Sequence, residues 1–372
     1  MERKIAPLLG KKDAVMICAP DGRTLAALNI NSLLVPASTL KVLTCLAAFH
    51  YLGDSYRFPT EFYLSPDTSL ILKGYGDPLL VSERLQVIGG HLATRLKTVH
   101  DLVLDASFFA QPIVIPGRGR SNEPYDAPNG ALCVNFNTVS FKRRNKDWAS
   151  AEPQTPLLPS AIPAIEASGL KEGRITLAGN SAEAVQYAGE LMAYFLNKAG
   201  VAVTGEIKAG KVDPDRDRLL WRYRSPDELE QVAVALLEFS NNFIANQLML
   251  AMGARAFGPP ATVDKGMQAL REYYRSTLGL KSGTVVEASG ISRDNRISAR
   301  TMMILLDRFT PYRTLMRHAG RQWYKTGHLN GIRSRVGYLD AAGGGHYRFV
   351  VMLNTPGRTT DRIMRILEKD LD

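Results

Sequence analysis

In the segment Pro36-Ala37-Ser38-Thr39-Leu40-Lys41, a serine and a lysine stand three residues apart just before an apolar run. The apolar periodicity predicts a helix that runs to about Tyr51 and stops at Gly53. Residues i and i+3 share one face of a helix, so we expect the Ser38 hydroxyl beside the Lys41 amine. Such a pair at the start of a helix is a candidate activated nucleophile. The competing interpretation of Ser38 is a helix N-cap.

The segments on either side of this helix predict a mixture of strands and helices. Residues 14–30 have the pattern of a β-hairpin, which indicates that the Ser38 helix packs on a sheet that this hairpin begins. From about residue 62 to 218, short strands alternate with helices at about 83–96 and 182–198, and residues 107–130 form an extended loop. We expect 62–218 to be a mixed α+β insertion with a small core of its own.

The remaining predicted elements complete both parts of the chain. In chain order they are strands at 131–141, 174–178 and 201–208, helices at 229–238, 243–252, 264–278 and 298–309, a strand–glycine turn–strand unit between Thr326 and Asn354, and a last helix at about 360–370.

Composition indicates an ordinary globular protein. The 372 residues are 45% hydrophobic and 22% charged, and the chain is long enough for more than one domain. It contains no apolar run of about 18 residues, so no transmembrane anchor is expected. The charged N-terminus lacks the apolar centre of a signal peptide, so the protein either stays in the cytoplasm or has lost a leader.

The distribution of cysteine and histidine argues against a metal or a disulfide framework. Cys18, Cys45 and Cys133 are odd in number and widely spaced, so we expect free, buried cysteines. The six histidines are scattered without ligand spacing, and neither a metal site nor a cofactor is expected.

The net charge of +10 would suit an anionic partner. The one basic cluster, Lys142-Arg143-Arg144 with Lys146, is expected to be a solvated loop. The chain carries no nucleic-acid-binding module, so no nucleic-acid partner is predicted.

Three short motifs follow one another along the chain. They are Ser38-x-x-Lys41, Ser240-x-Asn242 and Lys325-Thr326-Gly327. Each is weak alone, but each lies in the local structure that its chemistry needs. The first opens a helix, the second joins two predicted helices, and the third begins a strand. Their joint occurrence favours a nucleophilic site over a cap and an exposed strand lysine.

Two of these motifs occur a second time. Ser168-x-x-Lys171 is flanked by glycines and does not open an apolar helix, so it is rejected. Lys281-Ser282-Gly283 precedes a short strand but lacks the long glycine-turned hairpin that follows Lys325, and it ranks second.

Four further segments of the chain, given at the end of this paragraph, carry the same resemblance as the three motifs. With the residues from Leu34 to Lys41, they resemble the class C low-molecular-mass penicillin-binding proteins, the peptidase S13 family of D-alanyl-D-alanine carboxypeptidases. The resemblance covers nearly the whole chain. The further segments are Gly74-Tyr75-Gly76-Asp77-Pro78, Tyr125-Asp126-Ala127-Pro128, Val134-Asn135-Phe136-Asn137 and Ala288-Ser289-Gly290-Ile291-Ser292-Arg293-Asp294-Asn295.

The resemblance implies an α+β fold. A β-lactamase/transpeptidase-like catalytic domain, an antiparallel sheet flanked by helices, would comprise residues 1–61 and 219–372, and residues 62–218 would be inserted into it. The implied activity is serine-type D-Ala-D-Ala carboxypeptidase, with endopeptidase activity as an option. The implied partners are peptidoglycan peptides ending in D-Ala-D-Ala, and β-lactam antibiotics as covalent inhibitors. The implied location is periplasmic or extracytoplasmic.

The resemblance also implies roles for the motif residues. Ser38 would attack the substrate carbonyl, and Lys41 would be neutral in order to accept its proton. Ser240 would relay a proton to the leaving amine, while Asn242 would hold the substrate amide and orient Lys41. Lys325 and Thr326 would bind the terminal carboxylate. Gly327 would let the substrate approach the strand edge, and the backbone N–H groups of Ser38 and His328 would form the oxyanion hole.

Two departures from the family pattern concern the cleft. The family usually has a small hydroxyl residue where His328 stands, and Gln322-Trp323-Tyr324 are expected to reshape one wall. Two other functions are weighed against a peptidase. A β-lactamase of the same superfamily usually lacks a long insertion after the nucleophile helix, and the intact motifs argue against a non-catalytic peptidoglycan-binding protein.

Overall fold

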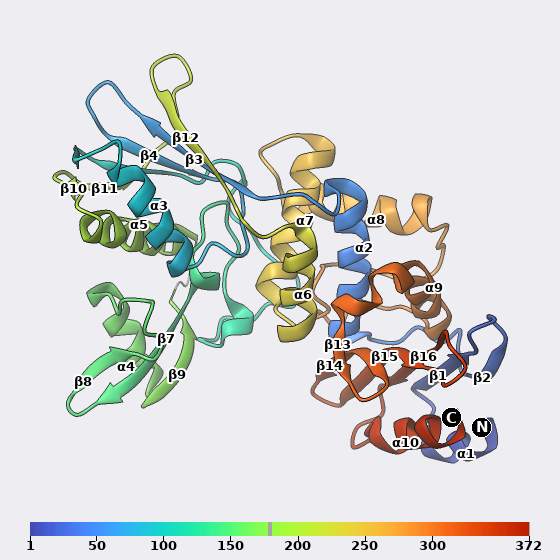
Figure 1. Cartoon of the computed structure of the whole chain (residues 1–372). Coiled ribbons are helices and arrows are strands. Elements are labelled where there is room, and N and C mark those ends of the chain that lie inside the picture. Colours follow the sequence, from blue (N-terminus) through green and yellow to red (C-terminus); the bar gives the residue numbers. More distant parts are fainter. Residues whose placement is uncertain (178–180, 372) are drawn as a thin grey trace.

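A six-stranded antiparallel sheet joins the two ends of the chain (Figure 1). The computed structural model describes residues 1–177 and 181–371. The strand order is β13-β14-β15-β16-β1-β2. The strands are β1 (Asp13–Cys18), β2 (Thr24–Leu28), β13 (Arg317–Ala319), β14 (Gln322–Leu329), β15 (Ile332–Asp340) and β16 (His346–Leu353).

Helices cover both faces of this sheet, as expected from the resemblance (Figure 1). On one face lie α1 (Glu2–Ile5) and α10 (Asp361–Asp370), packed on inward residues such as Val15 and Phe349. The other face carries the main core, which is built from α2 (Lys41–Leu52), α6 (Leu229–Phe239), α7 (Asn242–Phe257), α8 (Val263–Glu272) and α9 (Ala299–Phe309).

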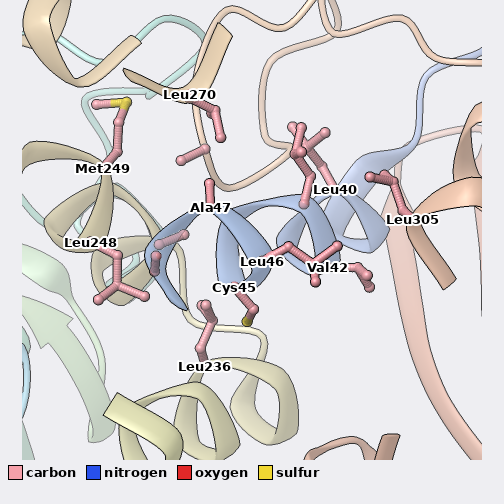
Figure 2. Packing of buried hydrophobic residues seen from close by; sticks show 14 of the residues in the cluster. Leu40, Val42, Cys45, Leu46, Ala47, Leu236, Leu248, Met249, Leu270 and Leu305 are labelled. Atoms are coloured by element: carbon pink, nitrogen blue, oxygen red, sulfur yellow. The ribbon is translucent and has the colours of Figure 1, made fainter. Parts of the chain in front are cut away.

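Helix α2 lies at the centre of that core (Figure 2). Its stop at Gly53 is confirmed, with a φ of +89° that favours glycine. The helix is buried from Lys41 to Phe49 instead of along one stripe, because α6, α7, α8 and α9 surround it. Truncating a leucine here to alanine would cost about 2–5 kcal/mol. The nucleophile segment is therefore anchored to a rigid element.

The middle of the chain, residues 59–224, forms an outer region with three further sheets, of five, three and two strands (Figure 1). The five-stranded sheet has the order β11-β6-β4-β3-β12 and is covered by α3 (Ser82–Ala93) and α5 (Ser181–Lys198). Its strands are β3 (Pro59–Leu64), β4 (Leu70–Gly74), β6 (Leu102–Asp105), β11 (Ile207–Ala209) and β12 (Arg218–Arg224). The three-stranded sheet β8-β7-β9 packs on α4 (Ile162–Ser168), with strands β7 (Thr138–Arg144), β8 (Asp147–Ser150) and β9 (Glu172–Thr176). A short parallel pair joins β5 (Thr98–Val99) to β10 (Ala202–Val203).

The predicted strand at 131–141 is wrong in its first half. Residues 131–137 are irregular, and β7 begins only at Thr138. Asn135, Phe136 and Asn137 all have positive φ, which ends extended structure. The Asn135 side chain accepts a hydrogen bond from Ser82 N at 2.9 Å, so tertiary contacts fix this turn.

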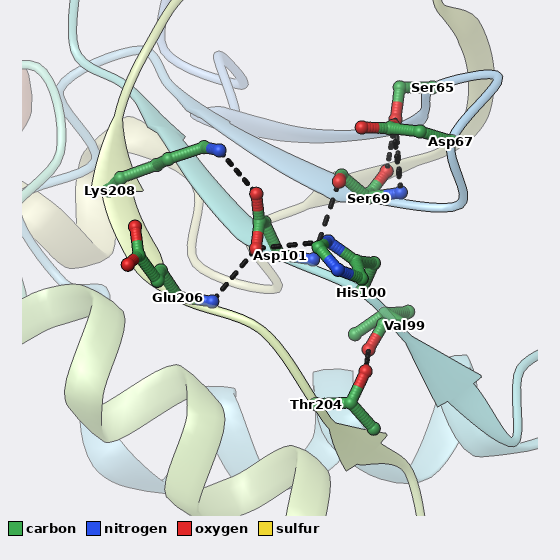
Figure 3. Close-up of polar contacts among 9 residues, drawn as sticks. All are labelled: Ser65, Asp67, Ser69, Val99, His100, Asp101, Thr204, Glu206 and Lys208. Atoms are coloured by element: carbon green, nitrogen blue, oxygen red, sulfur yellow. Dashed lines mark hydrogen bonds and ion pairs between the residues drawn. The ribbon is translucent and has the colours of Figure 1, made fainter.

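The predicted strand at 201–208 is divided into β10 and β11 for a reason visible in Figure 3. The Asp101 carboxylate lies between them, accepting a hydrogen bond from Glu206 N at 2.8 Å and pairing with Lys208. A buried carboxylate needs such donors, and bonding to it interrupts the strand at Thr204-Gly205. The contacts of Asp101 thus stabilise the edge of the outer region.

The outer region is tied to α7 by one fully buried side chain. Gln247 Nε2 donates to Gly130 O at 2.9 Å and to Gly76 O at 3.3 Å, while its Oε1 accepts from Gly130 N at 3.2 Å and Asn129 Nδ2 at 3.1 Å. Residues 108–133 consequently pack on the helix that also carries Asn242. Within the described residues, no helix has the length and apolarity needed to cross a membrane.

Candidate active site

Ser38 lies in a short 3-10 segment, Ala37–Leu40, that leads directly into α2. Lys41 Nζ is 3.0 Å from Ser38 Oγ, which confirms the expected juxtaposition. The N-cap positions of the two helical segments are Pro36 and Leu40, so the competing interpretation of Ser38 as an N-cap is wrong. Ala37 has a φ of +51°, a conformation that L-residues rarely adopt and that is common next to functional groups.

Lys41 is fully buried and has three oxygen neighbours. Besides Ser38 Oγ, these are Asn242 Oδ1 at 2.8 Å and the Ser289 carbonyl at 2.6 Å. Burial, reinforced by the positive charge of Lys325, holds the pKa of Lys41 well below its ordinary value. An amine in this setting can be neutral near pH 7 and accept a proton.

Ser240 and Asn242 are presented by the junction between α6 and α7. Ser240 has a left-handed φ of +53° that ends α6, and the side chain of Asn241 caps α7 by accepting from Ile244 N at 3.1 Å. The sharp turn directs Asn242 to Lys41 and Ser240 to Lys325. The predicted helix–helix junction is therefore confirmed.

Lys325 reaches the same pocket from β14. Its Nζ donates to Ser240 Oγ and to the Thr326 carbonyl, both at 2.8 Å, and only 2% of the residue is exposed. Burial lowers the pKa of Lys325 to about 8. A chain of polar contacts thus runs from Ser38 through Lys41 to Asn242, and from Ser240 to Lys325.

Gly327 packs against the nucleophile segment. A methyl group at this position would lie 2.8 Å from Pro36 O and 3.1 Å from Ser38 N, so only glycine lets β14 come this close. The sequence suggested a different reason for this glycine, the approach of the substrate. Thr326 and His328 alternate with Lys325 and Gly327 along the strand, and both are more exposed than those two buried residues.

His328 is exposed, and partial burial together with the charges of Arg333 and Lys325 lowers its pKa. The lowered pKa favours the neutral imidazole, and the backbone N–H of His328 follows Gly327 at the edge of the pocket.

The expected reshaping of the cleft wall by residues 322–324 is wrong for two of the three. Gln322 donates to Glu368 of α10, and Tyr324 packs in the core beneath that helix. Trp323 alone shares the face of Lys325, where it packs beside the main core and stacks on His318. The alternation of side chains along β14 explains the division.

The second copies of the two motifs, one rejected and one ranked second, lie elsewhere. Ser168 is the last residue of α4, with its hydroxyl bonded to Ile165 O at 2.6 Å, and Lys281 is exposed. The three cysteines are free and buried, as predicted. Among the described residues, no group of His, Cys, Asp and Glu could hold a metal ion.

Sequence reasoning missed the role of residues 287–290. This loop was singled out only by its resemblance to the family, yet Ser289 supplies the carbonyl next to Lys41. Thr44 Oγ1 of α2 donates to Ala288 O at 2.5 Å and fixes the loop on the nucleophile helix. A main-chain carbonyl leaves no residue-type signal, so the sequence could not have predicted this contact.

Several known proteins are similar to this chain in sequence. The family described as D-Ala-D-Ala carboxypeptidase 3 (S13) matches residues 5–176 and 171–319, so Lys325 lies just beyond the match. A D-alanyl-D-alanine carboxypeptidase of Actinomadura sp. (strain R39) is 27% identical over 344 residues, 78% of this chain and 63% of that protein. DacB of Haemophilus influenzae is 24% identical over 76% of this chain and 67% of its own length. The chain therefore spans less than two thirds of the first of these relatives.

Solved structures show the same fold. Penicillin binding protein 4 (dacB) from Haemophilus influenzae superposes with a TM-score of 0.79 at 19% identity, covering 99% of this chain and 98% of its own. Bd3459, a predatory peptidoglycan endopeptidase from Bdellovibrio bacteriovorus, gives 0.55 at 15% identity over 96% and 90%. The α+β fold of the penicillin-binding and β-lactamase type is thus confirmed. By the extent of the family match, the chain belongs to the D-Ala-D-Ala carboxypeptidase 3 (S13) family.

Proposed function

We propose that the protein is a serine-type DD-peptidase that cleaves peptidoglycan stem peptides ending in D-Ala-D-Ala through an acyl-enzyme on Ser38. The observation that carries the proposal is the position of Ser38 Oγ, 3.0 Å from a buried lysine whose pKa is depressed. A serine hydroxyl becomes a useful nucleophile only when a base of this kind can take its proton.

Acylation follows from the contacts of the site. Lys41 takes the Ser38 proton as Oγ attacks the penultimate D-Ala carbonyl, and the oxyanion is held by the N–H groups of Ser38 and His328. Gly327 lies close to Ser38 N, which supports an oxyanion hole formed by the backbone of the nucleophile segment together with the backbone of β14. The C–N bond then breaks, and the proton passes through Ser240 to the amine of the departing D-Ala.

The ends of the substrate have charged and polar partners. Lys325, with Thr326, binds the terminal carboxylate, and Asn242 holds the amide on the acyl side. A water molecule then attacks the ester, which transfers its hydroxyl to the acyl group and returns a proton to Ser38. A β-lactam would acylate Ser38 by the same route, because its ring amide and carboxylate imitate the scissile bond and terminal carboxylate.

Three associated proposals follow from family membership. Residues 1–61 and 219–372 form the catalytic domain around residues 62–218. The core under the five-stranded sheet, distinct from the main core, supports this division, and residues 108–133 pack on the catalytic domain. A peptidoglycan substrate places the protein in the periplasm or otherwise outside the cytoplasm. The structural neighbour Bd3459, named as a peptidoglycan endopeptidase, supports cross-linked peptides as a second candidate substrate class.

Labelling with a fluorescent penicillin tests the nucleophile. The wild-type protein and Ser168→Ala should become labelled, whereas Ser38→Ala should not, since Ser38 Oγ lies 3.0 Å from the Lys41 amine and the Ser168 hydroxyl bonds to Ile165 O. Ser168→Ala is the matched control because Ser168 belongs to the second S-x-x-K sequence. Wild-type protein that neither becomes labelled nor releases D-alanine from a pentapeptide would refute the function.

Product analysis separates the remaining possibilities. Mass spectrometry of muropeptides should show loss of one D-alanine for a carboxypeptidase and cleaved dimers for an endopeptidase. Rapid turnover of penicillin would instead indicate a β-lactamase, and binding of wall fragments without any acyl-enzyme would indicate a non-catalytic protein.

A further inference from the structure

Glu287 is a fully buried carboxylate next to the active site. Its Oε2 accepts hydrogen bonds from Ser289 N and Ser289 Oγ, both at 2.6 Å. Its Oε1 accepts from Gly290 N at 2.7 Å, Ser292 N at 3.3 Å and Asn295 Nδ2 at 2.6 Å. One side chain thus binds five donors within nine residues of the chain.

The chemistry of these five groups requires an acceptor. Each presents N–H or O–H to the carboxylate, and an ionised carboxylate is acceptor-only, with room for about four or five such bonds. A glutamine would place an NH₂ group against two or three of the donors. Buried groups left facing each other in this way each cost about 1–3 kcal/mol.

The loop that Glu287 holds is packed on the nucleophile segment at three consecutive residues. Ala288 is bonded to Thr44 Oγ1 through its carbonyl and to Asn246 Oδ1 through its N–H, at 2.5 and 3.2 Å. The Ser289 carbonyl accepts from Lys41 Nζ. At Gly290, with a φ of +84°, a methyl group would lie only 1.9 Å from Ala37 O.

The position of the Ser289 carbonyl determines what Lys41 can do. A neutral amine has two hydrogens and one lone pair, and Lys41 has three oxygen neighbours. The Ser289 carbonyl and Asn242 Oδ1 can only accept, so they take both hydrogens. The lone pair is then left for Ser38, whose hydroxyl is the one neighbour with a proton to give.

We propose that Glu287 is a positioning residue for the peptidase reaction: by fixing the Ser289 carbonyl, it directs the lone pair of Lys41 at the Ser38 hydroxyl. Its negative charge also opposes the lowering of the Lys41 pKa. Two other titratable groups lie near Lys41. They are Lys325 on β14, whose positive charge opposes protonation of the Lys41 amine, and Cys45 on α2. The inference rests on the proposed function, because it assigns Lys41 as the base.

Two variants at this position separate geometry from charge. Glu287→Gln should lower the plateau rate of Ser38 acylation by fluorescent penicillin about 100-fold, the loss typical of a 1 Å misplacement of a reacting group. It should also move the acidic limb of the pH–rate profile to lower pH by about one unit, since an anion near the Lys41 ammonium is lost. Glu287→Asp keeps the charge, so its acidic limb should stay in place while its plateau falls less.

Asp294→Asn is the matched control, because it removes an exposed carboxylate from the same loop. It should leave both the plateau and the limb unchanged. If Glu287 had a purely structural role, Glu287→Gln would reduce only the fraction of protein that becomes labelled, as counted by stoichiometric titration. The protein that does become labelled would then keep the wild-type acylation rate and the wild-type acidic limb of the pH–rate profile. That outcome, or a folded Glu287→Gln with wild-type kinetics, overturns the proposal.

A readout independent of activity distinguishes this inference from the function it rests on. In protein labelled with ¹³C at lysine Cε, the Lys41 signal, assigned by its absence in Lys41→Arg, should titrate at lower pH in Glu287→Gln than in wild type. If wild type fails to react with penicillin, the function fails, but the titration still shows whether Glu287 sets the proton affinity of Lys41. An unchanged titration overturns the inference alone.

Discussion

At the scale of single residues, the site places two buried lysines in one pocket and gives them different properties. Lys41 is fully buried and its pKa is depressed further by the charge of Lys325. Lys325 is slightly less buried, and its pKa falls only to about 8. At pH 7 the first can serve as a base while most of the second remains a cation. Two like side chains are thus separated into different roles by their surroundings.

This difference predicts an alkaline limit to activity. Below pH 8 Lys325 is charged and binds the substrate carboxylate, and above pH 8 it loses the proton and that attraction. The KM for D-alanine release from a pentapeptide should therefore rise about tenfold per pH unit above 8, following the fraction of charged lysine. Initial rates measured from pH 6 to 10 give the profile.

Lys325→Arg tests whether this lysine is responsible, since arginine keeps its charge throughout that range. The alkaline rise in KM should disappear in this variant, even if the longer side chain lowers kcat. Lys281→Arg, in the exposed second copy of the motif, should retain the wild-type profile. An alkaline rise that survives in Lys325→Arg would assign it to another group.

At the scale of elements, the site is the meeting point of three strips of backbone. The nucleophile segment, strand β14 and the loop after Val286 lie so close that glycine is needed on both sides of Ala37. Gly327 faces it from the strand, and Gly290 faces it from the loop. Elements in such contact hold the reacting groups more precisely than flexible loops would.

Gly290→Ala should therefore disrupt the site through packing. The φ of +84° is unfavourable for alanine, and its methyl group would overlap the Ala37 carbonyl. We expect loss of at least 90% of penicillin labelling and a decrease of about 2 kcal/mol in the free energy of unfolding. Gly343→Ala, in the open β15–β16 turn, has free space around it and should behave as wild type in both measurements. Normal labelling of Gly290→Ala would show that the loop can retreat without consequence.

The sequence could predict those parts of the site that lie within one element or at the junction of two neighbouring elements. The motif at Ser38 was readable because its two residues lie in one turn of helix, and the motif at Ser240 because it ends one helix before another. The Ser289 carbonyl and the contacts of Glu287 were not readable, since they act through main-chain atoms and through tertiary packing. For the same reason, the side chain of Asp101 divided a strand that periodicity alone predicted to be continuous.

At the scale of the whole molecule, the outer region joins the helical core around Gly76 and Asp77, where α7 contributes Gln247 and the chain returning to α6 contributes Ser225 and Asp227. Gln247 bonds to Gly76, and Asp77 follows it as a buried residue. Burial raises the pKa of Asp77 to about 7, and the neighbouring Asp227 carboxylate adds to the increase while Arg84 opposes it. A carboxyl that stays protonated up to neutral pH links the stability of this junction to pH.

The sign of that link follows from proton binding. Between pH 4 and 7 the folded protein keeps the Asp77 proton and the unfolded chain has released it, so the free energy of unfolding falls as pH rises and levels off above pH 7. Moving the pKa from 3.8 to about 7 corresponds to ~4 kcal/mol.

Asp77→Asn cannot ionise and can still accept the hydrogen bond from Leu79 N. Its stability relative to wild type should therefore increase by up to ~4 kcal/mol between pH 4.5 and 8 in urea unfolding. The exposed Asp215→Asn should differ from wild type by the same small amount at both pH values. A constant offset for Asp77→Asn would mean that Asp77 is ionised in the folded protein and that the junction tolerates its charge.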